Sequence, residues 1–201
     1  MHSLIKVAAL FLALAGPAIA QGSPNQSRVR GEVTALNGDM LSVKTLEGTD
    51  ASVKLASGYS VGGVVKATTA DIKRGSYIGV GARPQADGSL QAVQVFIFPE
   101  AMRGTGEGHR PWGVLPDTTM TNATVADTVS RVDGANLVLN YPGGEQKVTI
   151  TPDANIIMAA PAEAAELKPG AQVAMTATKQ PDGSLSVSRI TIAKPGAQLP
   201  Y

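Results

Sequence analysis

The sequence contains no cysteine and is poor in aromatic and charged residues. Cysteine is absent from all 201 residues, aromatic residues make up 4% of the chain, and charged residues make up 16%. Without cysteine the chain can form no disulfide, thiolate metal site, cysteine nucleophile or lipid-anchored N-terminal cysteine. The charged fraction is below the usual quarter, and the chain holds 22 glycines and 13 prolines. This composition argues against both a long helical protein and a charged disordered chain.

The first twenty residues, Met1–Ala20, have the three parts of a secretory signal peptide. Lys6 supplies a positive charge, Val7–Ala15 is a short apolar run, and Ala18-Ile19-Ala20 is a small-x-small cleavage site. The apolar run is shorter than the roughly 20 residues that span a bilayer. An uncleaved N-terminal anchor is the alternative. We therefore expect export to the periplasm, or secretion, with a mature chain that begins at Gln21.

Removal of the leader changes the charge balance of the chain. Loss of Lys6 leaves 16 basic residues against 16 acidic ones, so the mature chain has no net charge. Its basic residues are scattered, and a neutral surface exerts no long-range attraction on a phosphate backbone. No later apolar run is long enough for a membrane helix. We therefore expect neither nucleic-acid binding nor a membrane span.

The mature sequence contains two copies of one domain. Asp71–Ile97 aligns with Glu166–Ile192 without a gap, so that Asp87-Gly88-Ser89-Leu90 falls on Asp182-Gly183-Ser184-Leu185, 95 residues later. Solenoid repeats run about 20–50 residues, so this period has the size of a whole small domain. The alignment predicts a first domain over residues 28–98, a second over 125–193, an inter-domain segment over 99–124 and a mobile tail over 194–201.

Each copy reads as five strands and one helical turn. In the first copy we expect strands at 28–36, 40–45, 51–55, 77–83 and 89–98, with a helical turn at 68–73. The second copy repeats this plan, with its helical turn at 161–168. Glycine-containing two-residue turns are typical of hairpins. Such turns are predicted at Asn37-Gly38, Asp87-Gly88, Asp133-Gly134 and Asp182-Gly183.

The order of three strands, a helical turn and two strands is that of the OB-fold, a partly open five-stranded barrel. Closure into a barrel removes most strand edges, which a domain of about 70 residues could not cover otherwise. The predicted fold class is therefore all-β, with two tandem small five-stranded OB-like barrels joined by a Gly/Pro-rich segment. The alternatives are a pair of small β-sandwiches, or one sandwich assembled from both halves.

These motifs resemble a family of secreted bacterial proteins. The pattern V-x-G-x-V occurs at Val29–Val33, L-x-V at Leu41–Val43, L-K-x-G-x-x-V at Leu167–Val173 and D-G-S-L at Asp182–Leu185. The chain resembles the family known as domain of unknown function 5666, which implies OB-like barrels and no catalytic residue. The segment GTGEGHRPW is similar to one in two-domain relatives, some of which carry the label of metal transporter permease. A permease needs several membrane spans, which this sequence lacks.

The segment between the copies holds the least common side chains. It contains the only histidine after the leader, His109, and the only tryptophan, Trp112, together with Arg103, Glu107 and Arg110. Three alternating glycines, at 104, 106 and 108, let the backbone approach a partner closely. One interpretation is a solvated linker. The other is a binding loop in which these five side chains contact one ligand, because loops held by a rigid scaffold commonly carry function.

Catalytic and metal-binding interpretations have less support. Gly58-Tyr59-Ser60-Val61-Gly62 matches the G-x-S-x-G nucleophile motif, but that motif requires a strand–turn–helix context that an all-β repeat lacks. A zinc site normally needs three or four ligands, and only Glu107 and His109 are candidates here. No catalytic residue and no cofactor are assigned. Asn122-Ala-Thr124 matches a glycosylation sequon, which matters only in a host with that machinery.

Two functions follow from these observations. The first is a non-enzymatic periplasmic binding or assembly protein that presents a barrel face and the 103–112 loop to a protein or a small polar ligand. The second is an accessory to periplasmic metal handling, or a metal-dependent enzyme, that uses Glu107 and His109. The few aromatic residues disfavour stacking against nucleotides or sugars.

Overall fold

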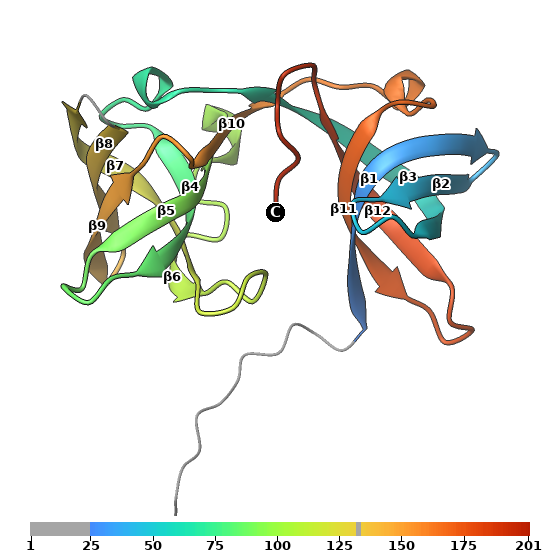
Figure 1. Cartoon of the computed structure of the whole chain (residues 1–201), viewed down its shortest axis with the longest axis horizontal. Helices are drawn as coiled ribbons and strands as arrows, with labels where there is room; N and C mark the ends of the chain where they lie inside the picture. Colours follow the sequence, from blue (N-terminus) through green and yellow to red (C-terminus); the bar gives the residue numbers. More distant parts are fainter. Residues whose placement is uncertain (1–24, 132–133) are drawn as a thin grey trace, which may run out of the picture.

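The computed structural model describes residues 25–131 and 134–201, and in these ranges the protein is all-β (Figure 1). The predicted leader and the turn residue Asp133 lie outside the described residues. The ranges contain no α-helix, and the predicted helical turns at 68–73 and 161–168 are the shorter 3-10 turns η1 (Thr69–Asp71) and η3 (Ala164–Glu166). A third 3-10 turn is η2 (Glu100–Met102). The strands are β1 (Gln26–Asn37), β2 (Met40–Thr45), β3 (Asp50–Lys66), β4 (Tyr77–Pro84), β5 (Leu90–Ile97), β6 (Gly108–Pro111), β7 (Thr119–Arg131), β8 (Gly134–Tyr141), β9 (Gly144–Ile150), β10 (Asn155–Ala160), β11 (Gln172–Lys179) and β12 (Leu185–Ala193).

The strands close into two rings of hydrogen-bonded neighbours. In ring 1, β1 pairs with β2, β2 with β3, β3 with β12, β12 with β11, and β11 again with β1. In ring 2, β7 pairs with β8, β8 with β9, β9 with β5, β5 with β4, and β4 again with β7. The β3–β12 contact in ring 1 and the β9–β5 contact in ring 2 are parallel, and the other contacts within the rings are antiparallel.

Neither ring is made from one sequence copy. Ring 1 takes three strands from the first copy and the β11–β12 hairpin from the second, whereas ring 2 takes three strands from the second copy and the β4–β5 hairpin from the first. The expectation that residues 28–98 and 125–193 each close a barrel of their own is therefore corrected by the strand pairing. The two copies have exchanged their last two strands within one chain.

The physical cause of the exchange is the length of β3. The sequence predicts an end at Leu55, but β3 continues to Lys66, a run of 17 residues that extends about 55 Å at roughly 3.3 Å per residue. This strand carries the chain out of ring 1 and into ring 2 (Figure 1). β10 brings the chain back, pairing antiparallel with β3 from Ile157↔Lys66 to Ala160↔Gly63. We call the β3–β10 pair the bridge.

The bridge strand β3 contains three glycines. Gly58, Gly62 and Gly63 are typical strand breakers, yet all three lie inside β3. A Cβ atom at Gly63 would lie 3.0 Å from the carbonyl oxygens of Ala160 and Pro161. Glycine is therefore needed there because the backbone of the partner strand approaches closely.

Two equivalent cores fill the rings, as the alternating apolar pattern predicts. Leu41, Val43 and Val53 are at most 1% exposed in ring 1, and their counterparts Leu137, Leu139 and Val148 are at most 2% exposed in ring 2. A third cluster at the bridge joins the rings. It contains Val64, Ile157, Ala174, Ala193 and Leu199.

Hairpins occur at both repeated Asp-Gly sites, but their loops are longer than the predicted two residues. The Gln85 N–H donates to the Ser89 carbonyl and the Gln180 N–H to the Ser184 carbonyl, each at 2.8 Å, so that three residues lie between the partners. Asp87 Oδ1 accepts hydrogen bonds from the backbone and hydroxyl of Ser89, at 3.0 and 2.6 Å, and Asp182 binds Ser184 in the same way at 2.9 and 2.6 Å. The first hairpin differs by one residue from the prediction. Asn37 pairs with Met40, so the turn is Gly38-Asp39, and Gly38 has a φ of +61°.

Candidate functional site

The predicted inter-domain segment 99–124 is folded onto ring 2 and is not a linker between two barrels. Arg103 holds its first half: the guanidinium pairs with Glu100 at 2.6 Å and donates to the carbonyl of Gly75 at 2.8 Å and to Thr124 Oγ1 at 3.2 Å. The hydrogen bond from Arg103 lowers the pKa of the Glu100 carboxyl. Arg103 therefore anchors the loop and does not reach the cleft described below.

The alternating glycines give the loop its shape. Gly104, Gly106 and Gly108 have φ values of +84°, +58° and +122°, a region that favours glycine. The carbonyl of Thr105 between them accepts hydrogen bonds from Tyr77 Oη at 3.1 Å and from Asn122 Nδ2 at 2.9 Å. The pKa of the Tyr77 phenol is raised by burial of the phenol and by the nearby Glu107 carboxylate. Glu107 itself is exposed on this loop.

The loop ends in β6, whose side chains alternate between two faces. His109 pairs with Thr121 in register, its Nδ1 lies 2.8 Å from Thr121 Oγ1, and its ring stacks on Tyr141 at 6.3 Å. Partial burial lowers the pKa of the His109 imidazole. Since successive strand residues point to opposite faces, Arg110 and His109 face different surroundings.

On the other face, Arg110 and Trp112 turn toward ring 1. Arg110 Nη1 donates to the carbonyl of Gly106 at 2.7 Å. The six-membered ring of Trp112 lies against Gly81 of β4, where a Cβ atom would approach Trp112 Cζ3 to 2.3 Å. The sequence has glycine at position 81 because the indole occupies the space of a side chain.

Arg110 and Trp112 line a cavity of about 460 Å³ between the two rings, which we call the cleft. Half of the chain's aromatic residues (1 Trp, 4 Tyr and 3 Phe in all) line it. Phe96 and Phe98 pack edge to face at 4.7 Å, and Trp112 packs edge to face with Tyr201 at 6.2 Å. The lining residues are Arg28, Gly79, Gln94, Phe96, Phe98, Arg110, Trp112, Val114, Met120, Asn122, Thr191, Pro200 and Tyr201.

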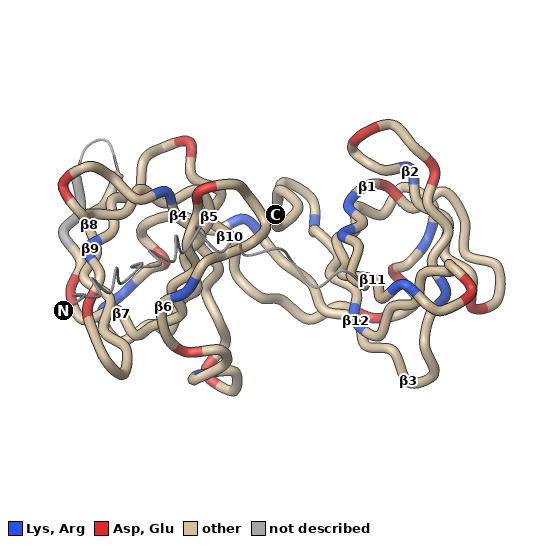
Figure 2. The backbone as a smooth tube through the Cα atoms, turned by 90° about the horizontal axis from the view of Figure 1, so that it is seen from below, with Lys and Arg blue, Asp and Glu red and all other residues tan. Residues whose placement is uncertain are grey.

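The cleft is electropositive although the protein as a whole is close to neutral. Arg28 and Arg110 line it, and Arg30 lies 5.0 Å from the centre of the Tyr201 ring. Burial of Arg28, together with repulsion from Arg30, lowers the pKa of the Arg28 guanidinium. Elsewhere basic and acidic residues are interspersed along both rings (Figure 2). The positive charge in the cleft is thus local.

Asn122, one of the lining residues, carries a buried acceptor without a partner. Its side chain is 6% exposed and its Oδ1 has no hydrogen-bond partner, while its Nδ2 is engaged by Thr105. Buried polar atoms are nearly always paired, so this oxygen is an uncommon orphan, but it lies below the surface and is not accessible from the cleft. The same burial encloses the asparagine of the predicted sequon.

The structure divides the five predicted site residues. Arg110 and Trp112 line the cleft, whereas Arg103 anchors the loop, His109 contacts ring 2 and Glu107 is exposed. Sequence reasoning missed Arg28, Gln94, Phe96, Phe98, Asn122 and Tyr201. Comparison of the two copies holds a signal for some of them, because Phe96 and Phe98 correspond to Thr191 and Ala193, so that these aromatic rings occur in one copy only.

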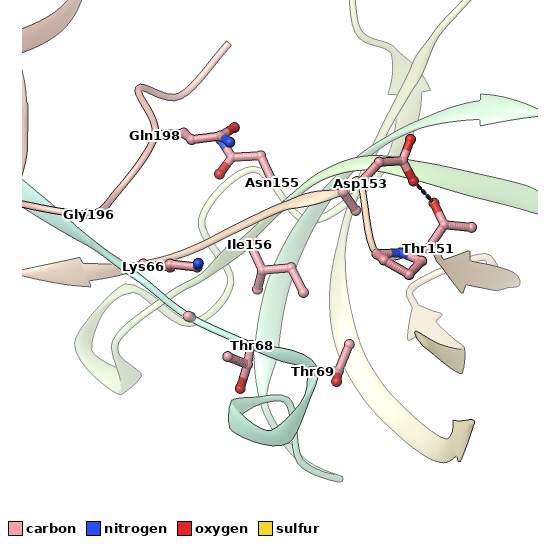
Figure 3. A pocket seen from close by; sticks show the side chains of 12 residues that line it. Lys66, Thr68, Thr69, Thr151, Asp153, Asn155, Ile156, Gly196 and Gln198 are labelled. Atoms are coloured by element: carbon pink, nitrogen blue, oxygen red, sulfur yellow. Dashed lines mark hydrogen bonds between the residues drawn. The ribbon is translucent and has the colours of Figure 1, made fainter. Parts of the chain in front are cut away.

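A second cavity, of about 430 Å³, lies beside the bridge (Figure 3). Short polar side chains line it, but they are engaged within their own turns. Thr151 Oγ1 donates to Asp153, and Thr68 binds Asp71 Oδ2 through its backbone at 2.8 Å and its hydroxyl at 2.9 Å. This cavity has no aromatic ring and carries less recognition chemistry than the cleft.

Metal and nucleophile motifs find little support in the geometry. Among residues 25–131 and 134–201, no group of three His, Asp or Glu side chains is placed to hold a metal ion. The sequence Gly58–Gly62 lies inside β3, and Ser60 Oγ is 3.5 Å from the carbonyl of Ser188. A nucleophile elbow needs a sharp turn between a strand and a helix, which this strand interior does not provide.

Comparison with known proteins identifies no relative: no family model, no curated protein and no solved structure matches this chain. Within the part of the chain that the structure describes, no helix is long and apolar enough to cross a membrane.

Proposed function

We propose that this protein is a non-enzymatic binding or assembly module that acts in the periplasm and recognises its ligand in the cleft. One observation carries the proposal: a chain with 4% aromatic residues gathers half of them at one cavity, together with Arg28 and Arg110. Aromatic and arginine side chains are the types that most often anchor interfaces.

The proposed OB-like character of the rings supports a binding role. The strand order around ring 1 is β1-β2-β3-β12-β11, and around ring 2 it is β7-β8-β9-β5-β4. Each ring therefore has the same arrangement, with one parallel contact, β3–β12 in ring 1 and β9–β5 in ring 2. OB barrels are known as binding scaffolds for extended ligands. Export is proposed from the leader pattern Met1–Ala20 alone.

The chemistry of the cleft defines the ligand class. Flat apolar surface on Trp112 and Phe98 favours an aromatic or aliphatic group, and the guanidiniums of Arg28 and Arg110 favour a carbonyl or carboxylate. A protein segment or a small polar ligand that combines these two groups satisfies the site.

The proposal is tested by comparative capture of partners from the periplasm of the source cells. Immobilised wild-type protein is compared with Trp112→Ala and Arg110→Glu, and with Tyr59→Ala as a matched control, because Tyr59 is an aromatic residue of ring 1 outside the cleft. We expect proteins retained by wild type and Tyr59→Ala to be lost with both cleft variants. Equal retention by all four proteins would refute the proposal.

Metal analysis of the same preparations tests the alternative function. Near-stoichiometric metal that disappears in His109→Ala would favour metal handling over the binding module. Circular dichroism of each variant shows whether its fold is kept, so that a lost partner is not mistaken for a lost structure.

A further inference from the structure

The segment that follows β12 forms one wall of the cleft and is held there as a bound peptide would be. Lys194–Ala197 form a turn, with the Ala197 N–H donating to the Lys194 carbonyl at 2.9 Å, and Gln198–Tyr201 then run between the two rings (Figure 1). No backbone–backbone hydrogen bond joins Gln198–Tyr201 to a strand in the described structure. We call residues 198–201 the tail segment.

Side chains from both rings bind the main chain of the tail segment. The Leu199 carbonyl accepts from Arg30 Nη2 at 3.3 Å and from Asn155 Nδ2 at 3.4 Å. The Tyr201 N–H donates to Gln94 Oε1 at 2.8 Å, and its carbonyl oxygen accepts from Arg28. Main-chain contacts of this kind recognise an extended peptide regardless of most of its side chains.

Two side chains of the tail segment fill specific places. Leu199 is 8% exposed and packs in the bridge cluster with Val64 and Ile157. The Tyr201 ring lies between the Arg30 guanidinium, at 5.0 Å, and Trp112, at 6.2 Å. The cleft therefore selects an aliphatic residue and, two positions later, an aromatic one.

Two buried amide side chains bind the tail segment. Gln94 and Asn155 are 6% and 7% exposed, and both direct their side chains to the tail segment. Their contact with each other is long, at 3.5 Å. These exposed fractions are those with the tail segment in place, and its main chain supplies hydrogen bonds that the buried amides need.

We propose that the cleft is a peptide-recognition groove, that its partner is an extended segment of another polypeptide with the pattern aliphatic–Pro–aromatic, and that the chain's own Leu199-Pro200-Tyr201 is a resident occupant which the partner displaces. This inference rests on the proposed function, because it names the partner of the same cleft. The remaining cavity beside Tyr201, lined by Arg110, gives the displacing segment contacts that the tail segment does not use.

The test uses a synthetic peptide with the sequence of residues 194–201, in which nitrotyrosine replaces the tyrosine. Nitrotyrosine quenches tryptophan emission, and Trp112 is the only tryptophan in the chain, so quenching reports occupancy of the cleft directly. The titration is made with the intact chain, with Leu199→Asp, which ejects the tail segment, and with a chain that ends at Gly196. A scrambled peptide and a peptide carrying Asp at the leucine position are the controls.

We expect saturable quenching in all three proteins, at peptide concentrations on the order of tenfold lower or more in the two variants, because the tethered occupant competes at a high effective concentration in the intact chain. Gln94→Leu in the Leu199→Asp background should weaken the binding. The absence of saturable quenching in the intact chain and in every folded variant, or equal quenching by the scrambled peptide, overturns the inference.

The two proposals fail in different ways. If the peptide does not bind but partner capture still depends on Trp112, the peptide inference is wrong and the binding function remains. If capture is independent of both Trp112 and Arg110, the proposed function itself is wrong.

Discussion

The contact between Gly81 and Trp112 allows a quantitative test of how the cleft is assembled. A Cβ atom added at Gly81 would lie 2.3, 2.5 and 2.7 Å from Cζ3, Cη2 and Cε3 of Trp112. These separations are far inside van der Waals contact, so the indole must move in Gly81→Ala. Since the chain has one tryptophan, its emission should shift to longer wavelength as the ring becomes more exposed to water.

The magnitude follows from two opposing effects. Overpacking of a close contact costs about 1–3 kcal/mol, whereas replacing glycine by alanine within a strand gains about 0.5–1 kcal/mol from reduced freedom of the unfolded chain. Gly81→Ala should therefore lower the free energy of unfolding by about 1–2 kcal/mol. In a Trp112→Ala background the clash is gone, and the same change should stabilise the protein by about 0.5 kcal/mol.

A double-mutant cycle measured by urea unfolding, with circular dichroism as the probe, separates these effects. Gly62→Ala is the matched control, because Gly62 also lies in a strand and a Cβ atom there would meet nothing within 4 Å. Its effect should be the same with and without Trp112. If the Gly81 and Trp112 changes add to within about 0.5 kcal/mol, the two sites do not interact and the reasoning is refuted.

Two further predictions follow from the pKa of His109 and from the strand exchange. Burial lowers the pKa of His109, so as the pH falls below about 6.5 the unfolded chain binds a proton before the folded one and stability decreases. The urea midpoint of His109→Gln should therefore depend less on pH than that of wild type between about pH 7.5 and 5, and identical slopes would contradict this. Chains of residues 25–105 and 106–201 each hold three strands of one ring and two of the other. Neither should give a folded monomer on gel filtration, whereas an equimolar mixture should recover the spectrum and size of the intact chain; a folded monomer of either half would disprove the exchange.

The sequence predicts the strands and the core well because both depend on local patterns. Alternation places Leu41 and Val43, and their counterparts Leu137 and Leu139, in the interior, and the Asp-Gly turns mark the second hairpin of each copy. The choice of pairing partner between two similar hairpins does not depend on local patterns. Since β5 and β12 carry similar apolar patterns, nothing local tells β4–β5 to pair with β7 and β9 rather than with β1 and β3.

The candidate site was only partly predictable for a similar reason. Arg110 and Trp112 stand out as uncommon residues in the inserted segment, and both line the cleft. The cleft is completed by β5, which directly precedes the insert, and by β1 and the tail segment, which are far from the insert along the chain. Tyr201 lies in a segment that the sequence predicts as mobile, and only the folded arrangement reveals its contacts with Gln94 and Arg28.

The exchanged pairing also sets the order in which the protein can form during synthesis. Ring 2 cannot close before β9 is complete at Ile150, and ring 1 cannot close before β12 is complete at Ala193. At roughly 5–20 residues per second, β1–β3 wait on the order of 10 s with an unpaired edge after they leave the ribosome. A copy that kept its own last two strands could close its ring as soon as those strands had been made. In this chain ring 1 stays open until Ala193 has been made, and during that interval slow aggregation or a chaperone must prevent the open strand edges from pairing with other chains.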